Sequence, residues 1–130
     1  MIILDTSAVT ALAAGHRALV RLADNAAASP FRHLSVPALC LLSAEVKSQG
    51  AGTFALALPA IEIEPLDSAS AVTVAAMVRD GIGAQDISHA LYCALPTGSR
   101  GTMHMILTDQ EHHYPPGTIT VHIDDPRLLS

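Results

Sequence analysis

Short apolar runs alternate along the chain with longer segments whose apolar positions recur every three or four residues. The runs predict β-strands at residues 1–4, 33–36, 61–64, 103–107 and 118–123. The intervening segments predict helices at residues 8–14, 16–28, 37–49, 50–58, 69–80 and 86–95. Strands that alternate with helices favour a parallel sheet with helices on both faces. We therefore expect a three-layer α/β/α fold around a central parallel sheet of four to five strands.

The helix predicted over residues 37–49 has a charged residue inside its apolar face. Leu41, Leu42 and Val46 follow helical spacing and are expected to be buried together. Glu45 lies in the same stripe, where a carboxylate needs a partner or a metal ion. The alternative is a glutamate near a helix end whose carboxylate reaches water.

The last two predicted helices have expected buried faces of their own. In the helix over residues 69–80 the expected buried face comprises Val72, Ala76 and Met77. In the helix over residues 86–95 it comprises Ile87, Ala90, Leu91 and Ala94.

The first strand runs directly into Asp5, and Thr6 and Ser7 follow. This order is typical of a helix N-cap, so the next helix should begin at once. It also places Asp5 at the carboxyl edge of a parallel sheet, where ligands bind in open α/β folds. Asp5 is thus either a simple cap or part of a binding site.

Three further acids are predicted near the same edge. Asp109 ends the fourth predicted strand, Asp86 begins the last helix, and Glu45 lies late on the helix after the second strand. Clustered carboxylates repel one another and persist only if a cation balances them. Oxygen ligands favour Mg²⁺ or Mn²⁺, and such an ion suits phosphodiester hydrolysis.

Composition narrows the class of protein. The length of 130 residues suits a single domain over residues 1–130. Half of the residues are hydrophobic but only 3% are aromatic, so the core should be aliphatic. The chain has a net charge of −5. Proteins that bind nucleic acid tightly and non-specifically instead have an excess of basic residues. Cys40 and Cys93 are expected to be buried thiols. No signal peptide or membrane span is evident, so the cytoplasm is the expected compartment.

The order of these motifs resembles the PIN-domain family, and within it the VapC-type toxins of bacterial toxin–antitoxin systems. The matching segments cover residues 3–8, 37–45, 86–90 and 106–109. The resemblance implies a PIN-like fold and a Mg²⁺- or Mn²⁺-dependent endoribonuclease that uses an activated water. It implies Asp5, Glu45 and Asp86 as the main catalytic and metal-binding acids. An RNA substrate, a cognate antitoxin and a homodimer are the implied partners, and the apolar composition also favours a homodimer.

The chain departs from the family pattern after Thr108. Many members carry a fourth acid two residues after this threonine, where Gln110 stands here, and Asp109 is one residue early. The site could comprise three acids, or four with Asp109 as the fourth. It could likewise hold one metal ion or two. Thr6 and Thr108 could orient carboxylates.

Arginines are the side chains that would contact RNA in such a site. Arg17, Arg21 and Arg100 are the candidates.

Two other functions are compatible with the same pattern. One is a PIN-like binding or regulatory module without useful activity. The other is a flavodoxin-like or response-regulator domain, but no lysine follows the fourth or fifth strand and no glycine-rich loop follows the first.

Overall fold

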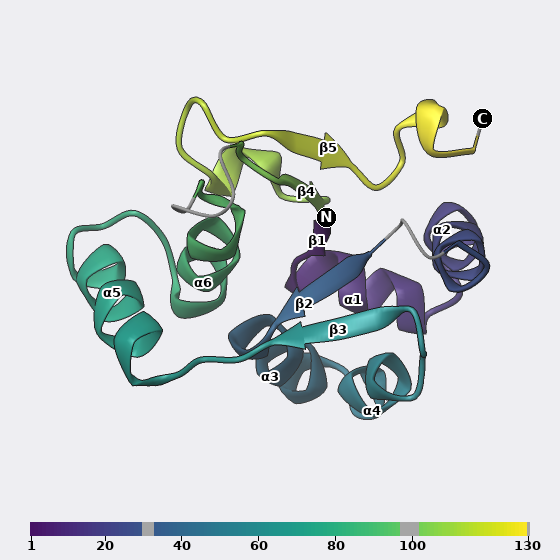
Figure 1. The fold of residues 1–130 in the computed structure, drawn as a ribbon, viewed down its shortest axis with the longest axis horizontal. Helices are drawn as coiled ribbons and strands as arrows, with labels where there is room; N and C mark the ends of the chain where they lie inside the picture. The colour runs from purple at the N-terminus through teal and green to yellow at the C-terminus, as the bar shows by residue number, and fades with distance from the viewer. Residues whose placement is uncertain (30–32, 97–101, 130) are drawn as a thin grey trace.

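The sheet is the organising element of the fold. The computed structural model describes residues 1–29, 33–96 and 102–129. The five described strands are all parallel, in the order β3-β2-β1-β4-β5 (Figure 1). They are β1 (Ile2–Leu4), β2 (Leu34–Pro37), β3 (Ile61–Glu64), β4 (Met105–Thr108) and β5 (Thr120–His122). The predicted parallel sheet is confirmed.

Helices cover the sheet on both sides, as the three-layer prediction required. The α-helices are α1 (Thr6–Ala13), α2 (Arg17–Ala27), α3 (Ala38–Lys47), α4 (Ala51–Leu56), α5 (Ser68–Arg79) and α6 (Gln85–Ala94). Two 3₁₀ turns follow, η1 (Glu111–His113) and η2 (Pro126–Leu129). Both α1 and α6 pack on β1 and β4, whereas α5 packs on α6 at the margin of the molecule (Figure 1). None of the helices in the described ranges is long and apolar enough to cross a membrane.

The strand order creates a crevice between β1 and β4. The chain proceeds outward from β1 to β2 and β3, and then returns to place β4 on the other side of β1. Ligands of open α/β sheets bind beyond the carboxyl ends of strands where the order reverses in this way. The flavodoxin-like order is 2-1-3-4-5, so the observed order disagrees with the response-regulator interpretation.

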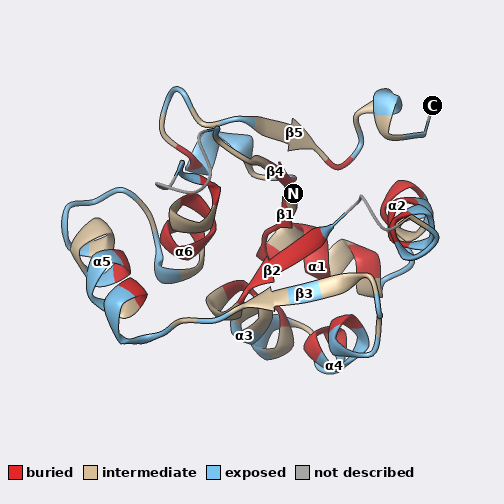
Figure 2. Ribbon diagram, viewed as in Figure 1, coloured by how far each residue is buried: buried red, intermediate tan, exposed pale blue. Residues whose placement is uncertain are grey.

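The three central strands form the core of the molecule, and the two edge strands are only partly buried (Figure 2). The most deeply buried hydrophobic side chains of the strands are Ile3, Leu4, Leu34, Val36, Ile106 and Leu107. These six are aliphatic, as the composition led us to expect, and the polar residues Ser35 and Thr108 are buried beside them. Because β1 is buried on both faces, the residue that follows it emerges from the most rigid part of the fold.

The apolar stripe predicted for α3 does not form its buried face. Leu42 is 59% exposed and Val46 is 78% exposed, whereas Cys40 and Ala44 are fully buried. The small side chains of Cys40 and Ala44 let α3 pack closely against both α1 and α6. The helix is therefore rotated relative to the prediction, and Glu45 is only partly buried.

The predictions for α5 and α6 had different outcomes. All four residues expected on the buried face of α6 are buried, from Ile87 to Ala94. On α5 the buried residues are Ser70 and Val74, and Val72 is 73% exposed. The edge position of α5 explains this error, because a helix that packs on only one neighbour has a narrow buried face.

The prediction of two buried thiols is confirmed for Cys40 and wrong for Cys93. Both residues are thiols, but only Cys40 is fully buried.

Candidate functional site

Asp5 is a buried acid at the end of the central strand, with 1% of its surface exposed. Its Oδ1 accepts hydrogen bonds from Ser7 Oγ (2.6 Å) and from the backbone N–H of Ala8 (3.1 Å). Its Oδ2 accepts a hydrogen bond of 2.8 Å from the Tyr114 hydroxyl. Asp5 is thus the N-cap of α1, as one interpretation of the sequence predicted. It also lies at the carboxyl edge of the sheet, as the second interpretation requires.

Asp86 lies next to Asp5 through a shared neighbour. It stands in the first turn of α6, where the helix dipole favours a negative charge. The Thr6 hydroxyl donates a hydrogen bond of 2.6 Å to Asp86 Oδ2. Because Thr6 directly follows Asp5 in the chain, the structure brings these two predicted site acids together.

The negative charges of both acids act on two buried groups, the Cys40 thiol and the Tyr114 hydroxyl. Burial raises the pKa of the Cys40 thiol, and the negative charges of Asp5 and Asp86 raise it further. Burial also raises the pKa of the Tyr114 hydroxyl, with Asp5 and its hydrogen bond as the next causes and Asp86 as a smaller one. Cys40 and Tyr114 therefore stay protonated, and neither is available as a nucleophile.

No cation within the described ranges balances this pair of acids. Neither Asp5 nor Asp86 forms an ion pair with a described lysine, arginine or histidine. Mg²⁺ is commonly held by one or two carboxylates, with waters and substrate phosphate completing its shell. A pair of oxygen donors in an uncompensated negative field fits such an ion.

Glu45 is engaged elsewhere. Its Oε2 accepts a hydrogen bond of 2.6 Å from the N–H of Gly50, and its Oε1 accepts one of 3.1 Å from the N–H of Thr53. These bonds lower the pKa of Glu45 and cap the start of α4. Among the residues that the structure describes, no three acidic, histidine or cysteine side chains are grouped so as to hold a metal ion. The four predicted acids thus do not form a single preassembled cluster.

Asp109 follows β4 on the rim of a cavity beside the acid pair. The Ser7 hydroxyl, which donates to Asp5, accepts a hydrogen bond of 2.9 Å from the Asp109 N–H. Thr108 Oγ1 lies 3.3 Å from Ser7 Oγ and accepts a hydrogen bond from the Gln110 N–H. The cavity has a volume of about 330 Å³ and is lined by Thr6, Ser7, Thr10, Ala11, Ala14, Lys47, Asp109 and Gln110. We call it the α1 groove.

The α1 groove contains a basic residue that sequence reasoning did not select. Lys47 is the last residue of α3 and lines the groove together with Asp109 and Gln110. The signal that could have revealed it is its position two residues after Glu45 in a chain with no other lysine.

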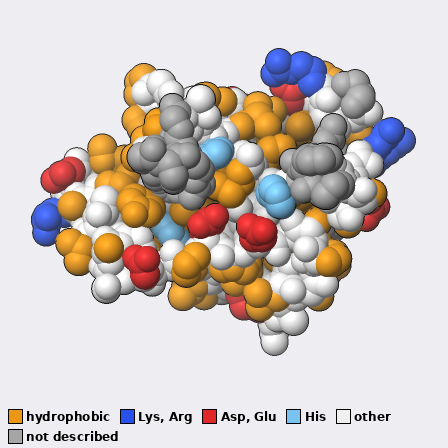
Figure 3. Space-filling model, in the orientation of Figure 1, with side chains coloured by type: hydrophobic (Ala, Val, Ile, Leu, Met, Phe, Trp, Pro, Cys, Tyr) orange, Lys and Arg blue, Asp and Glu red, His pale blue; other side chains and the backbone are white. Residues whose placement is uncertain are grey.

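Of the arginines proposed for RNA binding, neither Arg17 nor Arg21 lines the α1 groove. Arg17 lines a separate cavity together with Asp124 and Asp125. Arg21 is exposed on α2, and Arg100 lies outside the described residues. On the face drawn in Figure 3, basic side chains stand at the outer margins, whereas acidic side chains lie both at the margins and near the centre.

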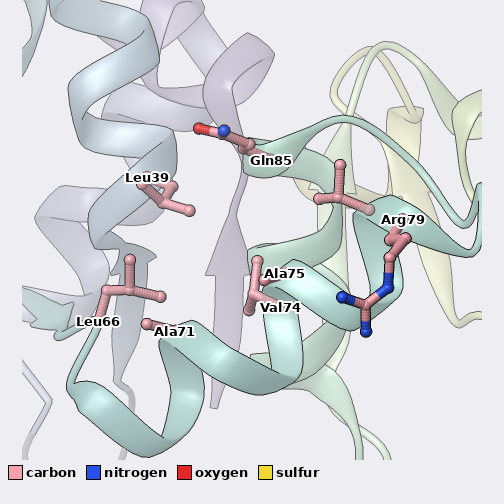
Figure 4. A pocket seen from close by; sticks show the side chains of 8 residues that line it. Leu39, Leu66, Ala71, Val74, Ala75, Arg79 and Gln85 are labelled. Atoms are coloured by element: carbon pink, nitrogen blue, oxygen red, sulfur yellow. The ribbon is translucent and has the colours of Figure 1, made fainter.

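A second cavity of similar size is apolar and separate from the acid pair. It has a volume of about 340 Å³ and lies between α5 and the starts of α3 and α6 (Figure 4). Its lining residues are Leu39, Leu66, Ala71, Val74, Ala75, Val78, Arg79 and Gln85. No carboxylate or nucleophile lines it, so we assign the candidate chemistry to the α1 groove and the acids beside it.

His89 is fully buried and caps α3. Its Nδ1 accepts a hydrogen bond of 3.3 Å from the N–H of Leu39, and its Nε2 has no hydrogen-bond partner within the described ranges. Burial lowers the pKa of His89, and the carbonyl of Pro65 opposes this effect only in part. One of the two ring nitrogens of His89 is therefore hydrogen-bonded within the described ranges.

Comparison with models of known protein families gave no match, and comparison with curated proteins gave no significant match. A function for this site is therefore argued from its geometry and chemistry.

Proposed function

We propose that the protein is a Mg²⁺- or Mn²⁺-dependent endoribonuclease of the PIN type, similar to VapC toxins. The observation that carries this proposal is the pair Asp5 and Asp86, joined through Thr6 at the crevice between β1 and β4. Two acids without a balancing cation suit a divalent ion, and such ions serve phosphodiester hydrolysis.

The residues around the pair have distinct roles in this proposal. Asp5 and Asp86 would hold the ion, which supplies a Lewis acid that offsets phosphate charge and lowers the pKa of water. Ser7 and Tyr114 fix the orientation of Asp5, and Thr6 fixes that of Asp86.

Two of the predicted acids would contribute less. Asp109 stands at the rim of the α1 groove and would act as an additional acid. Glu45 would join the set only by giving up its bonds to Gly50 and Thr53. Its contribution to metal affinity should therefore be smaller than that of Asp86.

The proposed partners follow from the resemblance and from exposed apolar surface. Leu42 and Val46 lie one turn apart on the outer side of α3, and both are mostly exposed. A second copy of the chain that packs on this side would bury them, so we propose a homodimer. A cognate antitoxin protein is the proposed regulator, and the cytoplasm is the proposed compartment.

A specific observation favours the non-catalytic alternative. Both oxygens of Asp5 already accept hydrogen bonds, and Glu45 caps α4. A PIN-like binding module would have this arrangement without needing a metal. Metal binding separates the two functions.

Titration calorimetry with Mn²⁺ and a cleavage assay on single-stranded RNA test the proposal together. We expect Mn²⁺ binding by the wild-type protein, RNA cleavage in Mg²⁺ or Mn²⁺, and no cleavage in EDTA. Asp86→Asn should abolish cleavage, with a loss larger than the roughly 10–100-fold typical of outer-shell partners of a metal.

Asp67→Asn is the matched control. Asp67, like Asp86, is an aspartate at the start of a helix, but it is the N-cap of α5 at the margin of the fold. Its variant should keep both metal binding and cleavage. Cleavage that continues at full rate in EDTA would contradict the proposal, as would an Asp86→Asn protein as active as the wild type.

A further inference from the structure

The α1 groove opens directly beside the acid pair. Thr6 and Ser7 line it, and the same two hydroxyls donate to Asp86 and Asp5. A strand of RNA whose scissile phosphate lies at the acids would have its neighbouring nucleotide in or near this groove. The groove is therefore a described cavity that adjoins the hydroxyl groups holding both acids.

Lys47 supplies the positive charge of this groove. It is the only lysine in the chain, and it forms no ion pair with another described residue. The one other charged residue that lines the groove is Asp109. An exposed ammonium group without an ion-pair partner is a compact donor for a phosphate oxygen.

Gln110 adds a neutral amide to the lining of the α1 groove, next to the Asp109 carboxylate. Its backbone N–H is held by Thr108 Oγ1 at 2.9 Å, so the residue has a defined position at the end of β4. A carboxylate at this position would repel a phosphate, whereas an amide both donates and accepts hydrogen bonds. Such a group suits a ribose 2′-hydroxyl or a phosphate oxygen.

We propose that Lys47 and Gln110 form a subsite for the ribose–phosphate backbone of single-stranded RNA, next to the scissile phosphate. This inference rests on the proposed ribonuclease function and assigns its substrate contacts. Lys47 binds the phosphate, and Gln110 forms a hydrogen bond with the RNA backbone in the same groove. Both are positioning residues, since neither contacts the reacting atoms.

Fluorescence anisotropy with a short, end-labelled single-stranded RNA tests the subsite. The titrations are made in EDTA, where metal-dependent cleavage is stopped, and over a series of salt concentrations. Lys47→Ala should weaken binding severalfold and reduce the slope of log Kd against log salt by about 0.7, which corresponds to one lost phosphate contact. Lys47→Arg should restore the slope, and Gln110→Glu should weaken binding.

Arg79→Ala is the matched control, because it removes the same charge from the apolar cavity on α5. It should leave both Kd and the salt slope close to the wild-type values. If Lys47→Ala and Arg79→Ala behave alike while the wild-type protein cleaves RNA with metal, the subsite is overturned and the proposed function stands. If the wild-type protein neither binds nor cleaves RNA, both are overturned.

Discussion

The Tyr114 hydroxyl donates a hydrogen bond of 2.8 Å to Asp5 Oδ2, across a separation of 109 positions in the chain. The bond joins the segment after η1 to the start of α1, and both residues are buried. A buried carboxylate is costly unless it is hydrogen-bonded, so this contact supports the acid at the centre of the proposed site.

Tyr114→Phe should lower the free energy of unfolding by about 1.5–3 kcal/mol, the usual range for a hydrogen bond to a charged group. Urea denaturation of the metal-free protein measures this loss. Tyr92→Phe is the control, because Tyr92 is only partly buried and its hydroxyl makes no described hydrogen bond. Equal stability of the two variants would show that the Asp5 contact contributes little.

Alkaline pH should destabilise the protein through the same residue. The pKa of Tyr114 is raised in the folded state, first by burial and then by Asp5. The tyrosine hydroxyl therefore loses its proton more readily in the unfolded chain than in the folded protein. The contribution of Tyr114 to stability is complete below about pH 10 and is lost as the pH rises further. As the pH is raised above about 10, the midpoint of urea denaturation should fall more steeply for the wild type than for Tyr114→Phe.

Acidic pH should act through His89. Its pKa is lowered in the folded state by burial, so folding favours the neutral ring. The contribution of the neutral ring to stability is therefore present above about pH 6.5. It is lost as the pH falls through the lower pKa that His89 has in the folded protein. His89→Gln should flatten the decline in stability on the acid side of neutrality. His112→Gln removes an exposed histidine and should leave the decline unchanged.

Gly83→Ala should disturb the start of α6, where Asp86 stands. A Cβ at this position would lie 2.7 Å from Ile87 Cγ2, and Ile87 is buried. We expect a loss of about 1–3 kcal/mol in unfolding free energy, as for other overpacked sites. In an Ile87→Ala background the same change should cost much less, since the clashing methyl group is absent. Additive losses in this double-mutant cycle would argue against the clash.

Light scattering at micromolar concentration should give the mass of a dimer. Val46→Glu places a charge on the exposed side of α3 and should shift the protein toward the monomer. Val72→Glu makes the same change on α5, at a residue of similar exposure, and should not. A wild-type protein with the mass of a monomer would refute the proposed interface.

The sequence by itself determined the elements and the layers. An apolar run that ends in Asp-Thr-Ser specifies a buried strand followed at once by a capped helix, as β1 and α1 confirm. The stripe of α6 was also predicted correctly, because this helix packs on three strands as well as on its neighbouring helices. Such features depend on residues close together in the chain, so local patterns are sufficient to reveal them.

Only the tertiary structure decided the details of the candidate site. The rotation of α3 depends on how closely Cys40 and Ala44 can approach α1 and α6, and spacing within α3 cannot reveal that distance. Glu45 turned to cap α4 because the N–H groups at the start of that helix lie within its reach. The pairing of Asp5 with Asp86, and the position of Lys47 in the α1 groove, likewise depend on contacts between segments distant in the chain. Short-range patterns fix which backbone each segment forms, whereas side-chain partners follow from packing between segments, which no single segment encodes.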